Sequence, residues 1–197
     1  MFDQIIQEIE SQGFSIRPHL LSSQEVSEAN EFFLRHSTEF QAALVGPETG
    51  KKRVEDIRGD FTLWLATDNA PREFRKLFEF LNELKSELNK RLFLGLRDYE
   101  AHLARYPVGS FYTRHLDRHE KKSTRVVSFV FYLNEEWKDG EGGELILYDK
   151  NNIEILRLQP EPGTFICFLS EEFPHEVKVA TRERRSLTGW IHSIQLS

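Results

Sequence analysis

The chain of 197 residues contains a single cysteine, Cys167. One cysteine excludes an intrachain disulfide, and it also excludes a zinc site built from several thiolates. No apolar run reaches the length needed to span a bilayer. The first residues, MFDQIIQEIESQGF, lack the basic stretch and the uninterrupted apolar core of a signal peptide. These absences lead us to expect a soluble, cytoplasmic protein without a membrane partner.

Basic residues are also in deficit: 26 Lys and Arg stand against 32 Asp and Glu, which gives a formal net charge of −6. A surface that binds nucleic acid is usually basic, and the short run RERR at 182–185 is too small to supply one. Hydrophobic residues make up 39% of the chain and include 16 Phe, which is enough for a sizeable core. We therefore predict a single domain over residues 1–197 that does not bind nucleic acid.

The N-terminal part of the sequence has the pattern of helices. Apolar residues recur at helical spacing near the start, and Gly13 predicts the end of that helix. Ser22 and Glu25 form the signature of a capping box, which predicts that a second helix begins there. The strongest helical pattern runs from Pro71 to Gly95. Its apolar stripe consists of Phe74, Leu77, Phe78, Leu81, Leu84, Leu88 and Leu92.

The pattern changes to short strands from residue 98 onward, after a strand-like stretch FTLWLAT and an exposed loop expected at 46–60. Helices followed by about eight strands favour an α+β domain. We predict a double-stranded β-helix, or jelly roll, with its core at 98–194 and helical support from residues 1–50. The expected strands are 99–106, 111–117, 124–133, 144–149, 153–158, 164–169, 175–180 and 185–194.

The stretch YTRHLDRHEKK contains a candidate metal site. His115 and Asp117 are two residues apart in a predicted strand, so their side chains leave the same face with Cα atoms roughly 6.6 Å apart. Two imidazoles and one carboxylate on one side of an ion are typical of non-haem Fe(II) oxygenases. The third ligand could be His119, in a turn-like polar run, or His175, which opens a late strand; we favour His175. The alternative is a solvated strand whose His and Asp pair with nearby Arg and Lys.

The stretch RERRSLTGW contains a candidate anion site. Arg184 and Ser186 share one face of the last predicted strand. An arginine that points into the protein needs an anion, and its planar guanidinium suits a carboxylate. The chemistry of these residues alone leaves Arg182, Arg184 and Arg185 as alternatives.

Together these features resemble a 2-oxoglutarate- and Fe(II)-dependent dioxygenase: HxD at His115 and Asp117, a distal His175, and R-x-S at Arg184 and Ser186. More narrowly, the chain resembles the catalytic domain of the hypoxia-inducible-factor prolyl hydroxylases and their bacterial relatives. The resemblance covers roughly residues 50–192. It is carried by DIRGD (56–60), RYPVGSFYTRHLD (105–117), FYLNEEW (131–137), GGELILY (142–148) and PHEV (174–177).

The resemblance implies a role for each residue that matches the family pattern. His115, Asp117 and His175 would ligate Fe(II), and 2-oxoglutarate and dioxygen would take the remaining positions on the ion. Arg184 would bind the far carboxylate of 2-oxoglutarate. The other residues implied to bind the co-substrate or to wall its pocket are Tyr132, Tyr106, Ser186, Leu145, Val177 and Trp190. Ascorbate is a further ligand that the resemblance suggests.

Alternation along one predicted strand, residues 124–133, agrees with parts of this assignment. This strand has a pocket-like face and a second face suited to packing under helices. Tyr112 is three residues from His115, so an uninterrupted strand would point it away from the metal, and we predict no role for it. The pocket-like face consists of Val126, Ser128, Val130 and Tyr132, and the other face of Phe129, Phe131 and Leu133.

The predicted function is hydroxylation of a proline in a protein, with release of succinate and carbon dioxide, beneath a lid formed by residues 46–60. One alternative is hydroxylation of a small molecule or free amino acid. Another is a catalytically silent module that senses metal or oxygen. Zinc-dependent hydrolysis is a weaker alternative, because the sequence shows no separate general base.

Overall fold

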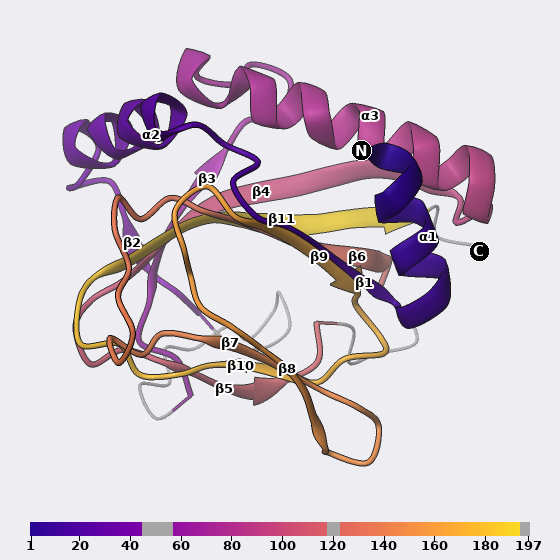
Figure 1. Cartoon of the computed structure of the whole chain (residues 1–197). Helices are drawn as coiled ribbons and strands as arrows, with labels where there is room; N and C mark the ends of the chain where they lie inside the picture. Colours follow the sequence, from indigo (N-terminus) through magenta and orange to yellow (C-terminus); the bar gives the residue numbers. More distant parts are fainter. Residues whose placement is uncertain (45–56, 118–122, 194–197) are drawn as a thin grey trace.

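Two antiparallel sheets face each other (Figure 1). The structure, a computed structural model, describes residues 1–44, 57–117 and 123–193. The larger sheet has seven strands in the order β1 (Phe14–Arg17), β9 (Phe165–Leu169), β6 (Arg125–Tyr132), β11 (Arg184–Ser193), β4 (Leu96–Tyr106), β3 (Phe61–Leu65) and β2 (Gln41–Ala42). The smaller sheet has four strands in the order β5 (Tyr112–His115), β10 (His175–Val177), β7 (Leu145–Tyr148) and β8 (Glu154–Leu158).

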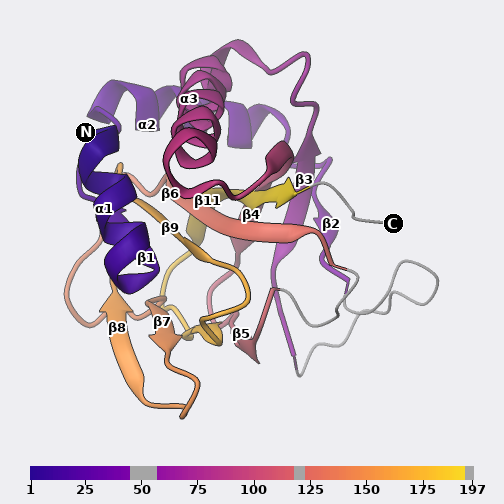
Figure 2. The ribbon, with the colours of Figure 1, turned by 90° about the vertical axis from the view of Figure 1, so that its right-hand side faces the viewer.

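Three α-helices cover the outer face of the large sheet, so its inner face is left to the small sheet (Figures 1 and 2). The helices are α1 (Phe2–Gln12), α2 (Ser23–Arg35) and α3 (Arg75–Leu92), and a short 3₁₀ turn, η1 (Arg72–Phe74), leads into α3. Gly13 ends α1 in the left-handed conformation, and Ser22 and Glu25 form the predicted capping box of α2. The end of α3 differs from prediction, because Phe93 rather than Gly95 is its left-handed C-cap.

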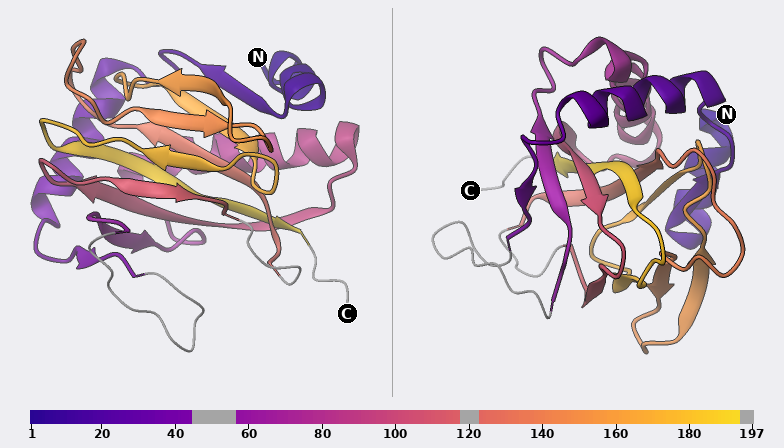
Figure 3. Two further views of the ribbon diagram at one scale, coloured as in Figure 1. Left: turned by 90° about the horizontal axis from the view of Figure 1, so that it is seen from below. Right: turned by 90° about the vertical axis from the view of Figure 1, so that its left-hand side faces the viewer.

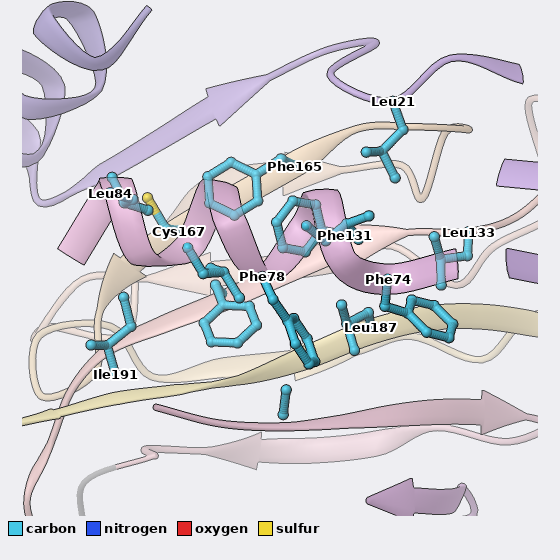
Figure 4. Close-up of a cluster of buried hydrophobic side chains, with 14 of the residues drawn as sticks. Leu21, Phe74, Phe78, Leu84, Phe131, Leu133, Phe165, Cys167, Leu187 and Ile191 are labelled. Atoms are coloured by element: carbon cyan, nitrogen blue, oxygen red, sulfur yellow. The ribbon is translucent and has the colours of Figure 1, made fainter. Parts of the chain in front are cut away.

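The main hydrophobic core lies between α3 and the large sheet. Figure 4 shows Phe78 and Leu84 of α3 among side chains from β6, β9 and β11. Phe129 and Phe131 of β6 point into this core, as the alternation of that strand predicts. A second cluster, which includes Tyr132, Leu147, Ile166 and Phe168, lies between the two sheets. The large sheet is therefore buried on both faces, which fixes the backbone on which inner-face side chains stand.

The predicted jelly-roll fold is confirmed. The eight strands expected after residue 98 are β4 to β11, with ends displaced by only a few residues. The strands β1 and β2 were not predicted, because each is too short to show a clear alternation of its own. The division into one domain over 1–197, with support at 1–50 and a core at 98–194, stays a prediction. Among the described residues, no helix is both long and apolar enough to cross a membrane.

Candidate active site

A pocket opens between the two sheets, and both sheets contribute to its walls. In Figure 3 the four strands of the small sheet lie across the inner face of the large one. The small sheet supplies residues from β5, β7 and β10, and the large sheet supplies residues from β4, β6, β9 and β11. The pocket is lined by Arg58, His102, Tyr106, Tyr112, His115, Asp117, Ser128, Val130, Leu145, Phe168, His175, Val177, Arg184, Ser186, Thr188 and Trp190.

Three side chains that can ligate a metal converge in this pocket. His115 and His175 are directly paired across the β5–β10 ladder, and Asp117 follows β5 by two residues. The Nε2 atoms of His115 and His175 each lie 3.5 Å from a carboxylate oxygen of Asp117. One potential ligand atom from each of the three residues lies within 4.8 Å of those from the other two. Two imidazole nitrogens and one carboxylate can therefore contact a single ion.

Both imidazoles are oriented by the main chain. His115 Nδ1 lies 2.8 Å from the carbonyl oxygen of Thr113, and His175 Nδ1 lies 3.0 Å from that of Phe173. A carbonyl oxygen can only accept a hydrogen bond, so Nδ1 carries the proton in each ring. Nε2 is therefore the nitrogen of each ring that can ligate a metal ion.

Asp117 is held as an anion. Burial alone would raise the pKa of its carboxyl group, but the neighbouring imidazoles of His175 and His115 hold that pKa well below its usual range. The hydroxyl of Ser128 lowers it further by donating a hydrogen bond to Oδ2 at 2.6 Å. A carboxylate anion faced by the Nε2 atoms of two imidazoles is a suitable site for a divalent cation.

Arg184 is a buried cation in the same pocket, with 2% of its surface exposed. Its Nε donates to the carbonyl oxygen of Gly143 at 3.0 Å. The guanidinium carbon lies 5.0 Å from the ring centroids of both Tyr106 and Tyr132. No acidic side chain among the described residues forms an ion pair with Arg184. A buried guanidinium without an acidic partner is suited to an anionic ligand.

The neighbouring arginines do not enter the pocket. Arg182 lies on the surface and pairs with Glu141. Arg185 points to the other face of the sheet, where its side chain bonds Asn30 and Glu183. The position of Arg184 therefore distinguishes it from the other two predicted candidates.

The structure brings most of the remaining predicted pocket residues to the same cavity. Tyr106, Ser186, Leu145, Val177 and Trp190 line the pocket. Tyr132 is fully buried behind Arg184, and its hydroxyl has no hydrogen-bond partner among the described residues. Burial raises the pKa of the Tyr106 and Tyr132 hydroxyls, so both are neutral donors at ordinary pH.

Two predictions from strand alternation were wrong because the ladders are irregular. Tyr112 does not point away: its ring stacks on that of His115 with centroids 3.7 Å apart. A bulge where β5 pairs with β10 sets Thr113 and Arg114 against Glu176 alone, and this reverses the parity between Tyr112 and His115. Val126 packs on the helical side rather than into the pocket, because the ladder between β6 and β11 shifts beside it.

Arg58 and His102 also line the pocket, and we did not predict either. Arg58 lies over the Tyr112 ring at 4.3 Å and makes two hydrogen bonds to the buried Asp60. The predicted exposed loop is therefore wrong for Asp60, whereas residues 45–56 of that loop, and the alternative ligand His119, lie outside the described residues. His102 is paired with Thr188 of β11, and Thr188 is paired with Val130 of β6, so the three side chains lie on one face of the large sheet. The alternation of residues along β4 could have indicated that His102 faces the pocket.

Comparisons with known proteins agree with this geometry. A family model described as the 2OG-Fe(II) oxygenase superfamily matches residues 101–192. A prolyl-4-hydroxylase from Pseudomonas putida is 36% identical with a TM-score of 0.85, and the match covers 98% of this chain and all of that one. A Trichoplax adhaerens prolyl hydroxylase, in complex with a hypoxia-inducible-factor peptide fragment, is 26% identical with a TM-score of 0.87, over 98% and 89% of the two chains.

Curated relatives match over smaller shares of their own length. A hypoxia-inducible factor prolyl hydroxylase from Caenorhabditis elegans is 30% identical over 70% of this chain but only 20% of the relative. A PKHD-type hydroxylase from Parvibaculum lavamentivorans is 32% identical over 47% of this chain and 41% of the relative. The chain thus spans between a fifth and two fifths of these curated relatives.

The fold and the site define an oxygenase that uses Fe(II), 2-oxoglutarate and dioxygen. The chain belongs to the 2OG-Fe(II) oxygenase superfamily and is a dioxygenase. The residues present fit these groups: nitrogen and oxygen ligands suit Fe(II), and the Arg184 guanidinium, which has no acidic partner among the described residues, suits a carboxylate together with the Tyr132 hydroxyl. The alternatives of a silent module and a zinc hydrolase are not retained.

Proposed function

We propose that this chain hydroxylates a prolyl residue in a protein, with His115, Asp117 and His175 as the ligands of Fe(II). The observation that carries the proposal is the presence, in one pocket, of this cluster and of a buried arginine that has no acidic partner in the described part of the chain. The cluster accounts for the metal, and the arginine accounts for a co-substrate with a carboxylate. When bound, Fe(II) with 2-oxoglutarate and dioxygen supplies the oxidising chemistry, and succinate and carbon dioxide are released.

The protein binds and orients the co-substrate. Arg184 receives its far carboxylate, and the hydroxyl of Tyr132 donates a further hydrogen bond to the same group. Tyr106, whose ring centroid is also 5.0 Å from the guanidinium carbon, contributes a second neutral hydroxyl to the pocket. Ser186 shares the strand face of Arg184, two residues further along β11. A charged co-substrate is thereby fixed at the end that does not react.

The apolar walls exclude water around the metal ligands. Leu145 and Val177 from the small sheet face Trp190 from the large sheet across the pocket. Exclusion of water strengthens the interaction of Arg184 with a carboxylate and protects reactive species from side reactions. The walls therefore contribute to binding and to selectivity without any acid–base role.

The prolyl substrate is supported by the relatives rather than by the pocket. Both solved relatives are prolyl hydroxylases, and one is described with a peptide fragment bound. The PKHD-type relative is described as a hydroxylase without a named substrate, so hydroxylation of a small molecule or free amino acid stays the alternative. A cytoplasmic location and a requirement for ascorbate stay predictions, and omission of ascorbate from the assay tests the second.

The test is a turnover assay with a proteome as substrate. The protein is loaded with Fe(II) and 2-oxoglutarate and incubated with cell extract, and proteins and small molecules are then analysed by mass spectrometry. We expect a proline that gains the mass of one oxygen atom, in proportion to the succinate formed. Asp117→Ala should form neither product. Oxidation confined to the small-molecule fraction would contradict the prolyl assignment and support the alternative.

A further inference from the structure

The three candidate metal ligands are oriented in two different ways. His115 and His175 are oriented by main-chain carbonyls two residues before each of them. Asp117 is oriented by a side chain, the hydroxyl of Ser128, which donates to Oδ2 at 2.6 Å. Ser128 is on β6 in the large sheet, whereas both histidines are on the small sheet. The carboxylate ligand thus depends on a hydroxyl from the opposite sheet.

A second hydroxyl lies behind Ser128. Ser170 Oγ is 2.9 Å from Ser128 Oγ, and both residues are buried. The Asp117 carboxylate can only accept, so the single hydroxyl proton of Ser128 points to Asp117. Ser170 must then be the donor to Ser128, which gives a chain from Ser170 through Ser128 to the carboxylate. Successive hydrogen bonds of this kind polarise and strengthen one another.

Both serines stand on fixed parts of the backbone. Ser128 is paired with Trp190 of β11 on one side and with Phe168 of β9 on the other. Ser170 follows β9, and its N–H donates to the carbonyl oxygen of Val126 at 2.9 Å. Neither backbone position can shift without disturbing the large sheet, so the side from which the Ser128 hydroxyl reaches Asp117 is fixed.

We propose that Ser128, supported by Ser170, is the positioning residue for the carboxylate ligand of the metal. It holds Oδ2 toward the large sheet and leaves Oδ1 facing the imidazole of His115, where Nε2 lies 3.5 Å away. The inference rests on the proposed metal site. It adds that the Ser128 hydroxyl sets the orientation of the Asp117 carboxylate, the anionic ligand of that site. Without that hydroxyl, Asp117 can turn about its side-chain bonds, and ordering it again on metal binding costs affinity.

The test compares two variants of the same shape. Ser128→Thr keeps the hydroxyl and Ser128→Val replaces it by a methyl group, and both branched side chains suit a strand. The probe is Mn²⁺, whose free form is followed by electron paramagnetic resonance during titration of the metal-free protein. We expect the dissociation constant of Ser128→Val to exceed that of Ser128→Thr by about 10-fold or more, as outer hydrogen bonds to metal ligands typically contribute.

A matched control separates this role from general damage to the core. Ser15 is a buried serine of β1 outside the pocket, so Ser15→Ala should bind Mn²⁺ like the wild type. Circular dichroism of each metal-free variant checks that the fold is intact. A purely structural role of Ser128 would lower the melting temperature without changing the Mn²⁺ dissociation constant of the folded fraction.

The outcomes distinguish the inference from the proposed function. Equal dissociation constants for Ser128→Thr and Ser128→Val, with the wild type still binding Mn²⁺, would overturn the positioning role alone. A wild type that does not bind Mn²⁺ would overturn the metal site itself, and the inference with it. If the Ser128 variants do not fold, Ser170→Ala decides: a raised dissociation constant supports the hydroxyl chain, and an unchanged one refutes it.

Discussion

The ring of Tyr112 stacks on the ring of His115, with centroids 3.7 Å apart and planes 18° from parallel. The guanidinium of Arg58 covers the Tyr112 ring, 4.3 Å from its centroid. One face of a proposed iron ligand is therefore covered by two successive planar groups. The hydrogen bond at Nδ1 fixes the direction of the imidazole, and the stack fixes its tilt.

Loss of this stack should weaken metal binding. Tyr112→Leu removes the aromatic contact, which is worth about 0.5–1.5 kcal/mol, so the Mn²⁺ dissociation constant should rise by about 2- to 10-fold. Tyr112→Phe keeps the ring and serves as the matched control. Titration of the metal-free proteins measures the effect, and equal affinities for Leu and Phe would show that the stack has no part in positioning His115.

Arg184 should control the affinity for 2-oxoglutarate and not for the metal. Truncating one partner of a buried charge pair costs at least about 2 kcal/mol, so Arg184→Ala should raise the KM for 2-oxoglutarate by about 30-fold or more. Arg182→Ala, which removes a partly exposed arginine that lies outside the pocket and pairs with Glu141, should leave that KM unchanged. Succinate formation measures both. A similar effect in the two variants would contradict the assignment of the co-substrate to Arg184.

The pair of Arg58 and Asp60 should stabilise the fold. The side chain of Asp60 is fully buried and accepts two hydrogen bonds from Arg58, at 2.7 and 2.6 Å. Asp60→Ala leaves a largely buried guanidinium without its counter-ion, so the free energy of unfolding should fall by about 3 kcal/mol or more. Urea denaturation monitored by tryptophan fluorescence measures the change.

The control for that pair has the same geometry on the surface. Arg157 makes two hydrogen bonds to Glu154, at 2.9 and 2.8 Å, with both side chains substantially exposed. Glu154→Ala should therefore lower the free energy of unfolding by no more than about 1 kcal/mol. If the two substitutions cost the same, burial does not determine the strength of these pairs.

His102 should make the fold sensitive to acid. Burial lowers the pKa of its imidazole to about 4, and the nearby Arg58 lowers it in the same direction. The unfolded chain has the ordinary pKa of 6.5 and binds a proton that the folded protein does not, so stability falls as pH decreases from 6.5 to about 4. Above pH 6.5 the imidazole is neutral in both states and has no effect on stability.

The substitution His102→Leu should remove this part of the pH dependence. As the pH falls from 6.5 to about 4, the wild type should lose more free energy of unfolding than His102→Leu does. Above pH 6.5 the difference between the two proteins should stay constant. Urea denaturation at several pH values measures the difference. A difference that does not change with pH would mean that His102 is not buried in its neutral form.

The sequence by itself determined the class of fold and most of the site. Alternation placed Phe129 and Phe131 on one face of β6 and Ser128 and Val130 on the other. Successive side chains of a regular strand point to opposite faces, and burial of both faces specifies the register. The spacing of His115 and Asp117 likewise predicted that they share a face. These are local properties, set by a few neighbouring residues.

Only the tertiary structure decided which distant groups meet. The bulge in β5 turns Tyr112 toward His115, and no count of residues along one strand could show it, because a bulge is defined by two paired strands. The structure distinguishes Arg184 from Arg182 and Arg185 because only Arg184 of these three lines the pocket. The other two form ion pairs with glutamates outside it. The hydrogen bond from Ser128 to Asp117 links β6 of the large sheet to the residue that follows β5 of the small sheet. The two sheets come together only in the folded chain, so the sequence could not show this contact.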